Sequence, residues 1–294
     1  MNFFFTLLVT GISVGSVYAL IATSLNLTFW TTRTLNFGQG SIMMLCSIGF
    51  ASMSARGMYL PLAASLCFLV AGSLGILVER LTVRPALKRA GSMGWVVSTL
   101  GLGILIQGLA AKYLGSQAIA FPEFLFSVHD NIYVGGVILS LQYVIVIVIT
   151  LAIMGSLELF LRRTQWGHAV RAVSEDPELA RVQGIPVDIV VASSFVASCL
   201  LAGLAGLLVA QISGTVDPSF GFDLVLLGFV AAVLGGMGSS AGALAGGITL
   251  GILTKLVGGY ISTAAEHGIA FALLMVILAM FPSGFLGRAE VRRA

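Results

Sequence analysis

Long apolar stretches separated by short polar ones run along the whole chain. A helix needs about 20 apolar residues to cross a bilayer, so repeated stretches near this length predict a polytopic helical membrane protein with about nine spans. The predicted spans are residues 4–29, 35–55, 59–80, 94–114, 134–160, 187–211, 222–236, 240–258 and 266–281.

Two places leave the number of spans open. Polar residues at 26–42 interrupt the apolar pattern, so this stretch is either a loop between two spans or a broken helix. The segments 222–236 and 240–258 are short and rich in glycine, and either one is a candidate re-entrant segment. We therefore expect an all-α integral membrane protein: a polytopic helical bundle of about 8–10 transmembrane spans, with glycine-rich, partly broken helices. We expect one transmembrane domain over residues 1–294.

The longest polar interruption covers residues 162–186, which we call the polar segment. Its second half carries helix start and stop signals. Asp176 is a good N-cap, Pro177 fits the first helical position, and Gly184 supplies a C-terminal stop. These signals predict a short surface helix over 177–183, and a capped helix displayed on one face of a membrane protein favours a soluble partner there.

Composition agrees with a membrane protein. Hydrophobic residues make up 58% of the chain and charged residues 9%, against about 25% charged in soluble domains. Mean hydropathy is +1.05. The apolar start has no basic residues before it and continues to Trp30, so we do not expect a cleavable signal.

The basic residues predict the orientation. They cluster at 80–89, 162–181 and 288–293, and the positive-inside rule places such clusters in the cytoplasm. We therefore expect the polar segment and the C-terminus to be cytoplasmic and the N-terminus to be periplasmic. The net charge of +3 is what this asymmetry leaves, and it calls for no nucleic-acid partner.

The chain has little chemistry of its own. None of its lysines follows a glycine, so a phosphate-binding G-x-x-x-x-G-K-[ST] loop is absent from the sequence. The histidines and cysteines lack metal-ligand spacing, and the cysteines are expected to be buried helix residues. We expect no catalytic residues and no metal site. The histidines are His129, His168 and His267, and the cysteines are Cys46, Cys67 and Cys199.

Acidic residues are nearly absent from the middle of the predicted spans, which argues against an ion-driven carrier. Glu79 and Glu158 lie at span ends, and each is expected to form an ion pair with the arginine near it, Arg80 or Arg162. The energy for transport must therefore come from elsewhere.

Glycine marks the predicted helix contacts. The chain has 36 glycines, and pairs four residues apart, such as Gly11 with Gly15 or Gly247 with Gly251, let helix backbones approach closely in lipid. The run 234–247 concentrates this character. It predicts either tight packing with a sharp turn, or a broken segment whose backbone lines a solute path.

Five motifs, in order along the chain, resemble those of branched-chain amino-acid ABC permeases. They are GSVYALIATSLNLTFWTTRTLNFGQG at 15–40, VERLTVRPALKR at 78–89, WGHAVRAVSEDPELARVQGI at 166–185, LGGMGSSAGALAGG at 234–247 and PSGFLG at 282–287. They span nearly the whole chain, and with the shared length and loop plan they make the chain similar to the LivH-type subunit of high-affinity branched-chain amino-acid uptake.

The resemblance implies the other subunits of the transporter. Such a permease pairs with a second homologous permease, or a second copy of itself, in the bacterial inner membrane. Two ATP-binding cassette subunits hold the ATP, a periplasmic solute-binding protein delivers the solute, and the permease carries neither cofactor nor enzymatic activity. The helix within the polar segment would sit in a cleft of the ATPase and couple nucleotide-driven closure to the spans. The coupling residues would be Ser174, Glu175, Asp176, Pro177, Glu178, Leu179, Ala180, Arg181, Val182, Gln183 and Gly184.

One motif departs from the family pattern. The family reads NFAHGE where this chain reads NFGQGS, so Gln39 replaces a titratable side chain and Ser41 removes a carboxylate. The solute therefore need not be leucine or a close relative, and the resemblance implies a branched-chain or other amino acid, or a related small solute such as an amide, urea or an aromatic acid. Polar residues on the spans line the solute path or serve as contacts between helices. They are Thr23, Asn26, Asn36, Gln39, Ser98, Thr99, Gln107, Ser194 and Gln211.

Two other classes remain open at this level. An ATP-independent secondary transporter or channel would need an ion-binding carboxylate or a selectivity ring, and an intramembrane enzyme would need a nucleophile with its base or a metal set. Genes for ATP-binding and solute-binding subunits beside this one would favour the permease.

Overall fold

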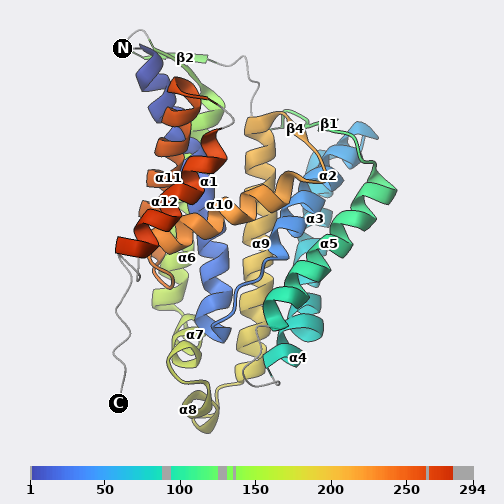
Figure 1. The fold of residues 1–294 in the computed structure, drawn as a ribbon. Coiled ribbons are helices and arrows are strands. Elements are labelled where there is room, and N and C mark those ends of the chain that lie inside the picture. Colours follow the sequence, from blue (N-terminus) through green and yellow to red (C-terminus); the bar gives the residue numbers. More distant parts are fainter. Residues whose placement is uncertain (1, 88–93, 125–130, 135–136, 263–264, 281–294) are drawn as a thin grey trace. The chain divides into compact units, whose positions relative to one another are not determined.

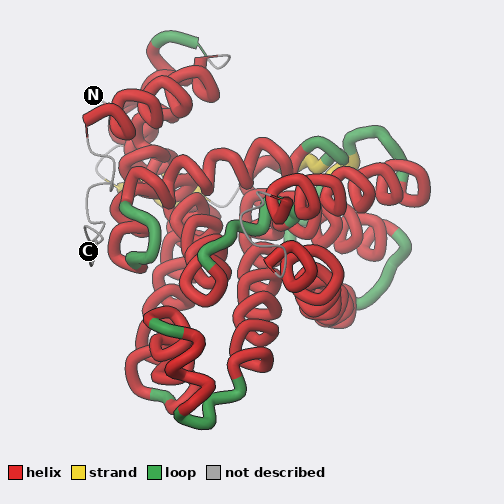
Figure 2. Tube along the Cα trace, turned by 60° about the horizontal axis from the view of Figure 1, so that its bottom comes forward, coloured by secondary structure: helices red, strands yellow, loops and turns green. Residues whose placement is uncertain are grey.

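The computed structural model describes residues 2–87, 94–124, 131–134, 137–262 and 265–280. Nearly all of these residues are helical, with two short pairs of strands (Figure 2). The predicted all-α class is confirmed. The chain forms two compact units, each made of separate stretches of sequence. Unit 1 holds residues 1–26, 128–154 and 226–294, and unit 2 holds 27–127 and 155–225. The single domain stays a prediction.

The helices and strands follow the apolar pattern closely (Figure 1). Three helices, α1, α6 and α10, pass from one unit to the other. In chain order, the elements are α1 (Asn2–Thr32), α2 (Gln39–Ala55), α3 (Leu60–Val78), the π-helix η1 (Glu79–Val83), α4 (Arg84–Leu87), α5 (Gly94–Leu114), β1 (Ile119–Ala120), β2 (Asn131–Val134), β3 (Val137–Ser140), α6 (Leu141–Arg163), α7 (Gln165–Glu175), α8 (Pro177–Val182), α9 (Val187–Ser213), β4 (Thr215–Val216), α10 (Phe220–Gly235), α11 (Ser240–Tyr260) and α12 (Ala265–Met280).

Each of the nine predicted spans contains a helix. Among the described residues, six helices are long and apolar enough to cross a membrane, and α2, α10 and α12 are shorter, with 17, 16 and 16 residues. The chain is thus a multi-pass membrane protein, and the number of eight to ten spans stays a prediction.

The start of the predicted span 134–160 is wrong. Residues 131–140 contain the antiparallel strands β2 and β3, and helix α6 begins only at Leu141. Because the strands are as apolar as the helix that follows, hydropathy alone did not separate them.

The stretch 26–42 is a break between two helices. Helix α1 ends at Thr32, and Arg33 takes a left-handed backbone conformation with φ of 55°. Helix α2 starts at Gln39, and the irregular residues Thr34, Leu35 and Asn36 between the helices are buried. The polar residues in this stretch therefore serve irregular backbone inside the protein, as the broken-helix alternative expected.

The core of unit 2 lies where α2, α3 and α9 pack together (Figure 1). A Cβ atom on Gly75 of α3 would lie 2.9 Å from the carbonyl oxygen of Phe195 on α9. A Cβ atom on Gly206 of α9 would lie 2.6 Å from the carbonyl oxygen of Met43 on α2. Small residues thus bring these helices into backbone contact, as their spacing predicted.

The three cysteines are buried helix residues, as expected, and all three are free thiols. The thiol of Cys46 on α2 donates to the carbonyl of Cys67 on α3 at 3.5 Å, and the Cys67 thiol donates to the carbonyl of Cys46 at 3.4 Å. This reciprocal pair ties α2 to α3, while Cys199 lies fully buried on α9.

Unit 1 contains a seam of glycines between α1 and α11, which we call the glycine seam. A Cβ atom on Gly11 would lie 2.8 Å from the Cα atom of Ile252, and one on Gly15 would lie 2.7 Å from the carbonyl oxygen of Gly247. Gly251 faces Gly15 in the same seam. The predicted pairs Gly11–Gly15 and Gly247–Gly251 therefore meet each other across two helices.

The run 234–247 forms a tight turn between α10 and α11. Gly236 and Gly238 have φ of 93° and 91°, values that favour glycine. The side-chain oxygen of Asn26 accepts from the amide of Gly238 at 3.2 Å, and its side-chain nitrogen donates to the carbonyl of Ser239 at 3.4 Å. Because Asn26 binds both backbone groups, the contacts support the tight-turn interpretation rather than free backbone groups lining a path.

Candidate functional site

The polar segment folds as two helices in unit 2, α7 and α8. The carboxylate of Asp176 accepts from the amides of Glu178 and Leu179 at 2.9 and 3.0 Å, and Pro177 is the first helical residue, as predicted. Helix α8 ends at Val182, within one residue of the prediction.

Gly184 ends α8 as its sequence position predicted. Its φ is 82°, its amide donates to the carbonyl of Arg181 at 3.1 Å, and the amide of Ile185 donates to the carbonyl of Ala180 at 3.0 Å. This pair of bonds is a Schellman motif, which needs the left-handed conformation at its glycine. No atom lies within 4 Å of a Cβ built on Gly184, so the backbone conformation alone favours glycine here.

Helix α7 was not predicted. The hydroxyl of Thr164 accepts from the amide of Gly167 at 3.1 Å, which caps the start of the helix. Val170 and Val173, three residues apart, are buried on one face. A threonine cap followed by this spacing was the available signal, but the arginines and the histidine around it obscured the period.

One face of α7 and α8 packs on the membrane helices and the other is open. Ala180 of α8 is buried in a cluster with Leu27 of α1 and with Val187 and Val190 of α9. On the opposite side of α8, Leu179 is 61% exposed and Val182 is 86% exposed. The helix therefore displays a small apolar surface away from the rest of unit 2.

Charged side chains connect the polar segment to the ends of the membrane helices. Arg84 lies 3.5 Å from the carboxylate of Glu79 and 2.6 Å from that of Asp188, and Arg181 lies 3.5 Å from Asp188. We call these four residues the ion-pair chain. Glu79 was expected to pair with Arg80, which is wrong, because η1 brings Arg84 to Glu79. The other predicted pair, Glu158 with Arg162, is confirmed at 2.6 Å.

The polar segment also contacts the end of α1. The guanidinium of Arg33 donates to the carbonyl of Ser174 at 3.4 Å and lies 5.5 Å from the ring centre of Phe29. An open cavity of about 760 Å³ lies beside this contact, and the ion-pair chain lines it together with Arg33 and Glu175. Arg84, Arg181 and Asp188 are therefore open to water, while Glu79 stays buried.

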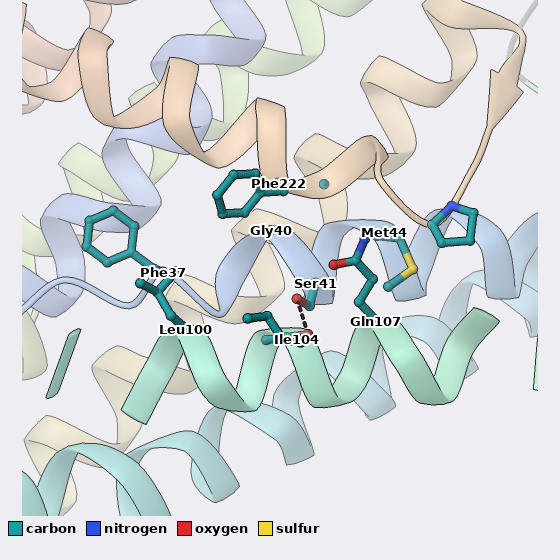
Figure 3. Close-up of a pocket in the computed structure, with 11 residues that line it drawn as sticks. Phe37, Gly40, Ser41, Met44, Leu100, Ile104, Gln107 and Phe222 are labelled. Atoms are coloured by element: carbon teal, nitrogen blue, oxygen red, sulfur yellow. Dashed lines mark hydrogen bonds between the residues drawn. The ribbon is translucent and has the colours of Figure 1, made fainter. Parts of the chain in front are cut away.

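A second, small cavity lies among α2, α5 and the start of α10 (Figure 3). The hydroxyl of Ser41 donates to the carbonyl of Gly103 at 2.8 Å, and Gln107 rises from α5 toward Met44 of α2. The cavity volume of about 20 Å³ holds about one water molecule, so α2 and α5 leave no room for a larger solute in this conformation.

The cavity brings together one predicted path residue, Gln107, and the departure Ser41. The remaining walls are mostly apolar or glycine, and none of the lining residues is ionisable. The lining residues are Phe37, Gly40, Ser41, Met44, Leu100, Gly103, Ile104, Gln107, Pro218, Gly221 and Phe222.

Hydroxyls among the other predicted path residues bind their own helices. Each hydroxyl donates to a carbonyl four residues earlier, at distances of 2.6 to 2.9 Å. This internal bond satisfies a hydroxyl within a span without a partner on another helix. These residues are Thr23, Ser98, Thr99 and Ser194.

The predicted amides act mainly as structural contacts. Asn36 accepts from the amide of Gly38 at 3.0 Å, and the Gln39 side chain donates to the hydroxyl of Ser198 on α9. Gln211 of α9 accepts from the amide of Phe124 at 3.5 Å. With Asn26 in the α10–α11 turn, these side chains fit the helix-contact alternative better than the path.

Metal chemistry finds no support in the described part of the chain, where no three histidine, cysteine or acidic residues come together as a metal site would require. His129 lies outside the described residues, and His168 is exposed on α7.

The family model and the similar proteins point to the same family of permeases. Residues 7–280 match the model of the branched-chain amino acid transport system / permease component. The high-affinity branched-chain amino acid transport system permease protein LivH of Salmonella typhimurium is 33% identical over 99% of this chain and 98% of its own length. The corresponding protein BraD of Pseudomonas aeruginosa is 32% identical over 97% and 96%.

More distant similarity extends to other permeases and to a solved structure. The fructose import permease protein FrcC of Rhizobium meliloti is 27% identical over 76% of this chain and 63% of its own length. The structure of PsaBC from Streptococcus pneumoniae in complex with Fab matches with a TM-score of 0.53 at 17% identity, covering 95% of this chain and 91% of that one. At that identity the match supports the fold alone.

Proposed function

The chain belongs to the family of branched-chain amino acid transport permease components, and on that basis we propose how it works. It is the membrane-spanning subunit of an ABC importer, without catalytic activity or a cofactor of its own. ATP is bound and hydrolysed by two partner subunits. The observation that carries the proposal is the family match over residues 7–280, joined to a capped, outward-facing α8.

Helix α8 would be the docking point for the ATP-binding subunit. Leu179 and Val182 offer an exposed apolar surface, and Glu178 and Arg181 flank it with opposite charges. This surface is too small for firm anchoring in a lipid interface, but it suits insertion into a cleft of a protein. The Asp176 cap and the Gly184 turn hold the helix in one conformation for that contact.

The polar segment faces the cytoplasm in this proposal, with the C-terminus, and the N-terminus is periplasmic. The contact of Arg84 with Asp188 puts the start of α4 and the start of α9 on one side of unit 2. That arrangement supports the positive-inside argument, which assigned both basic clusters to the same compartment. The membrane is the bacterial inner membrane.

The remaining partners follow from the family. A second homologous permease, or a second copy of this chain, would complete the translocation path, and a periplasmic solute-binding protein would deliver the solute. The relatives LivH and BraD are named for branched-chain amino acids. The solute here would be a branched-chain or other amino acid, or a small amide, urea or an aromatic acid.

An ATP-independent carrier or channel is not favoured. The full-length relatives are permease proteins of branched-chain amino acid transport systems, and acidic residues, which ion coupling requires, are nearly absent from the middle of the spans.

The test is reconstitution with the predicted partners. The chain is purified with the ATP-binding subunits and the second permease encoded beside it, placed in liposomes, and supplied with the solute-binding protein and labelled leucine. ATP-dependent uptake by the complex supports the proposal. Purification of the chain alone, or uptake that does not require ATP, would overturn it.

Gly184→Val sharpens this test. A β-branched residue disfavours the left-handed backbone that ends α8, so we expect ATP hydrolysis without proportionate uptake, in a complex that still assembles. Gly184→Asn is the matched control, because asparagine adopts this conformation at low cost and should retain uptake. Normal uptake by the valine variant would contradict the assigned role of α8.

A further inference from the structure

The ion-pair chain connects helix α8 to the start of α9 and to the end of α3. Arg181 stands in the last turn of α8, Asp188 in the first turn of α9, and Glu79 directly after α3. Arg84 lies between the last two, within 3.5 Å of Glu79 and 2.6 Å of Asp188. Three separate elements are therefore connected through shared charges.

The two carboxylates sit in different surroundings. The side chain of Glu79 is 5% exposed, whereas that of Asp188 is 65% exposed. Arg84 forms an ion pair with the buried carboxylate of Glu79, and it reaches outward from there to the exposed carboxylate of Asp188. The contact to Asp188 thus lies at the hydrated end of an arginine that is fixed at its inner end.

Helix η1 explains why Arg84 reaches both groups. The backbone amide of Arg84 donates to the carbonyl of Glu79, five residues earlier. This spacing adds one residue to a normal helical turn. An extra residue rotates the following side chains by about 100° around the helix. The π-turn therefore brings Arg84 rather than Arg80 to Glu79, and directs its guanidinium to α9.

We propose that Arg84 and Asp188 are positioning residues that pass the movement of α8 to α3 and α9 during the transport cycle. This inference rests on the function proposed above. Asp188 binds the guanidinium of Arg181 on α8 and that of Arg84 at the start of α4, so a displacement of α8 shifts the charge balance at both. Hydrated ion pairs are weak and exchange partners readily, which suits a contact that must break and reform in each cycle.

The close packing of α9 extends this connection into unit 2. Gly75 of α3 touches Phe195 of α9 through backbone atoms, and Gly206 of α9 touches Met43 of α2. A tilt of α9 at Asp188 is therefore passed to α3 and α2 rather than absorbed by soft side chains. Since Ser41 and Met44 of α2 line the small cavity, this packing connects α8 to that cavity within one unit.

The experiment uses the reconstituted complex and measures solute imported per ATP hydrolysed. We compare Asp188→Asn, Arg84→Gln and the double variant, and Asp188→Glu serves as the conservative rescue. Each neutral variant should lower the ratio of uptake to hydrolysis on the order of fivefold, with the ATP-binding subunits still copurifying. Because the two residues act through each other, the double variant should be no worse than the worse single.

Glu158→Gln is the matched control. It removes an ion pair of the same length, 2.6 Å, that lies within α6 and connects no two elements. Its ratio should stay at the wild-type value, and Asp188→Glu should recover most of the loss. A structural role alone would lower the amount of complex without changing the ratio.

Three results would overturn the proposal. They are an unchanged ratio in both single variants, a double variant whose loss is the product of the single losses, and loss of the ATP-binding subunits from Asp188→Asn and Arg84→Gln alike. Should Asp188→Asn fail to fold, Arg84→Lys gives the same test, because lysine keeps the charge but cannot bridge two carboxylates with a planar fork. Absence of ATP-dependent uptake in the wild type would instead refute the proposed function, and the inference with it.

Discussion

The glycine seam in unit 1 and the polar segment in unit 2 are held together in opposite ways. In the seam, α1 and α11 meet through backbone atoms, with Gly15 against Gly247 and no side chain between them. The contacts of the polar segment include side-chain charges and caps that water reaches, such as Arg181 with Asp188. Backbone contact tolerates no added volume, whereas hydrated charges break and reform easily. We therefore expect the seam to keep its geometry and the polar segment to be the easier of the two regions to displace.

Substitution in the seam should have the largest effect. Gly15→Leu would place a Cβ 2.7 Å from the carbonyl oxygen of Gly247, and α1 and α11 would have to separate. We expect a loss of about 3 kcal/mol or more of stability, seen as a fall in the thermal unfolding midpoint in detergent. Gly108→Leu on α5 is the control, since no atom lies within 4 Å of its Cβ. Equal midpoints for the two variants would remove the contrast between the regions.

The turn between α10 and α11 should come next. Asn26→Leu keeps the size of the side chain but removes both hydrogen bonds, to the amide of Gly238 and the carbonyl of Ser239. We expect about 1–2 kcal/mol of destabilisation by the same unfolding measurement. Asn26→Asp retains an acceptor for Gly238 and should lose less. Were both variants as stable as the wild type, Asn26 would have to be reassigned from structural contact to solute path.

In the polar segment, loss of the α8 cap should act locally. Asp176→Ala frees the amides of Glu178 and Leu179, which should cost about 1 kcal/mol of helix stability. Hydrogen exchange should speed up over residues 178–182 while the global unfolding midpoint stays unchanged. Asp176→Asn keeps the cap and should exchange like the wild type. A fall of the global midpoint would mean that α8 is part of the rigid core rather than a movable element.

The smallest effect is expected for an ion pair within one helix. Glu158→Gln removes the 2.6 Å contact with Arg162, an exposed pair four residues apart on α6. Such pairs contribute about 0.3–0.5 kcal/mol, and salt screens them. At high salt, the unfolding midpoints of the variant and the wild type should be indistinguishable within the error of the measurement. A larger shift that persists in salt would show that charges in this region hold the fold as firmly as the glycines do.

Features that act within a few residues were readable from the sequence. The α8 helix was predicted from Asp176, Pro177 and Gly184 because a cap, a first-turn proline and a left-handed glycine each work on neighbouring backbone. Its role in coupling stays a prediction. The glycine pairs were readable for a similar reason, since four-residue spacing marks one face of a helix.

Features that depend on distant partners were not readable. The pairing of Glu79 with Arg84 rather than Arg80 follows from a π-turn, and a one-residue insertion leaves no mark in a hydropathy pattern. Polar type alone did not separate Ser194, which binds its own helix, from Gln107, which lines a cavity. Ser41 was noted as a departure but was not counted among the path residues, because its facing helix was unknown.

The two-residue bridge between β1 and β4 has a consequence for how the protein is made. Ile119 pairs with Val216 and Ala120 with Thr215, and α9 lies between these strands in the sequence. Since synthesis proceeds from the N-terminus, β1 leaves the ribosome long before its partner exists. Strand β1 therefore has no partner strand until α9 has been inserted and β4 has been synthesised. A nascent chain that stops before Thr215 is therefore the stage at which we expect β1 to be most accessible to proteases.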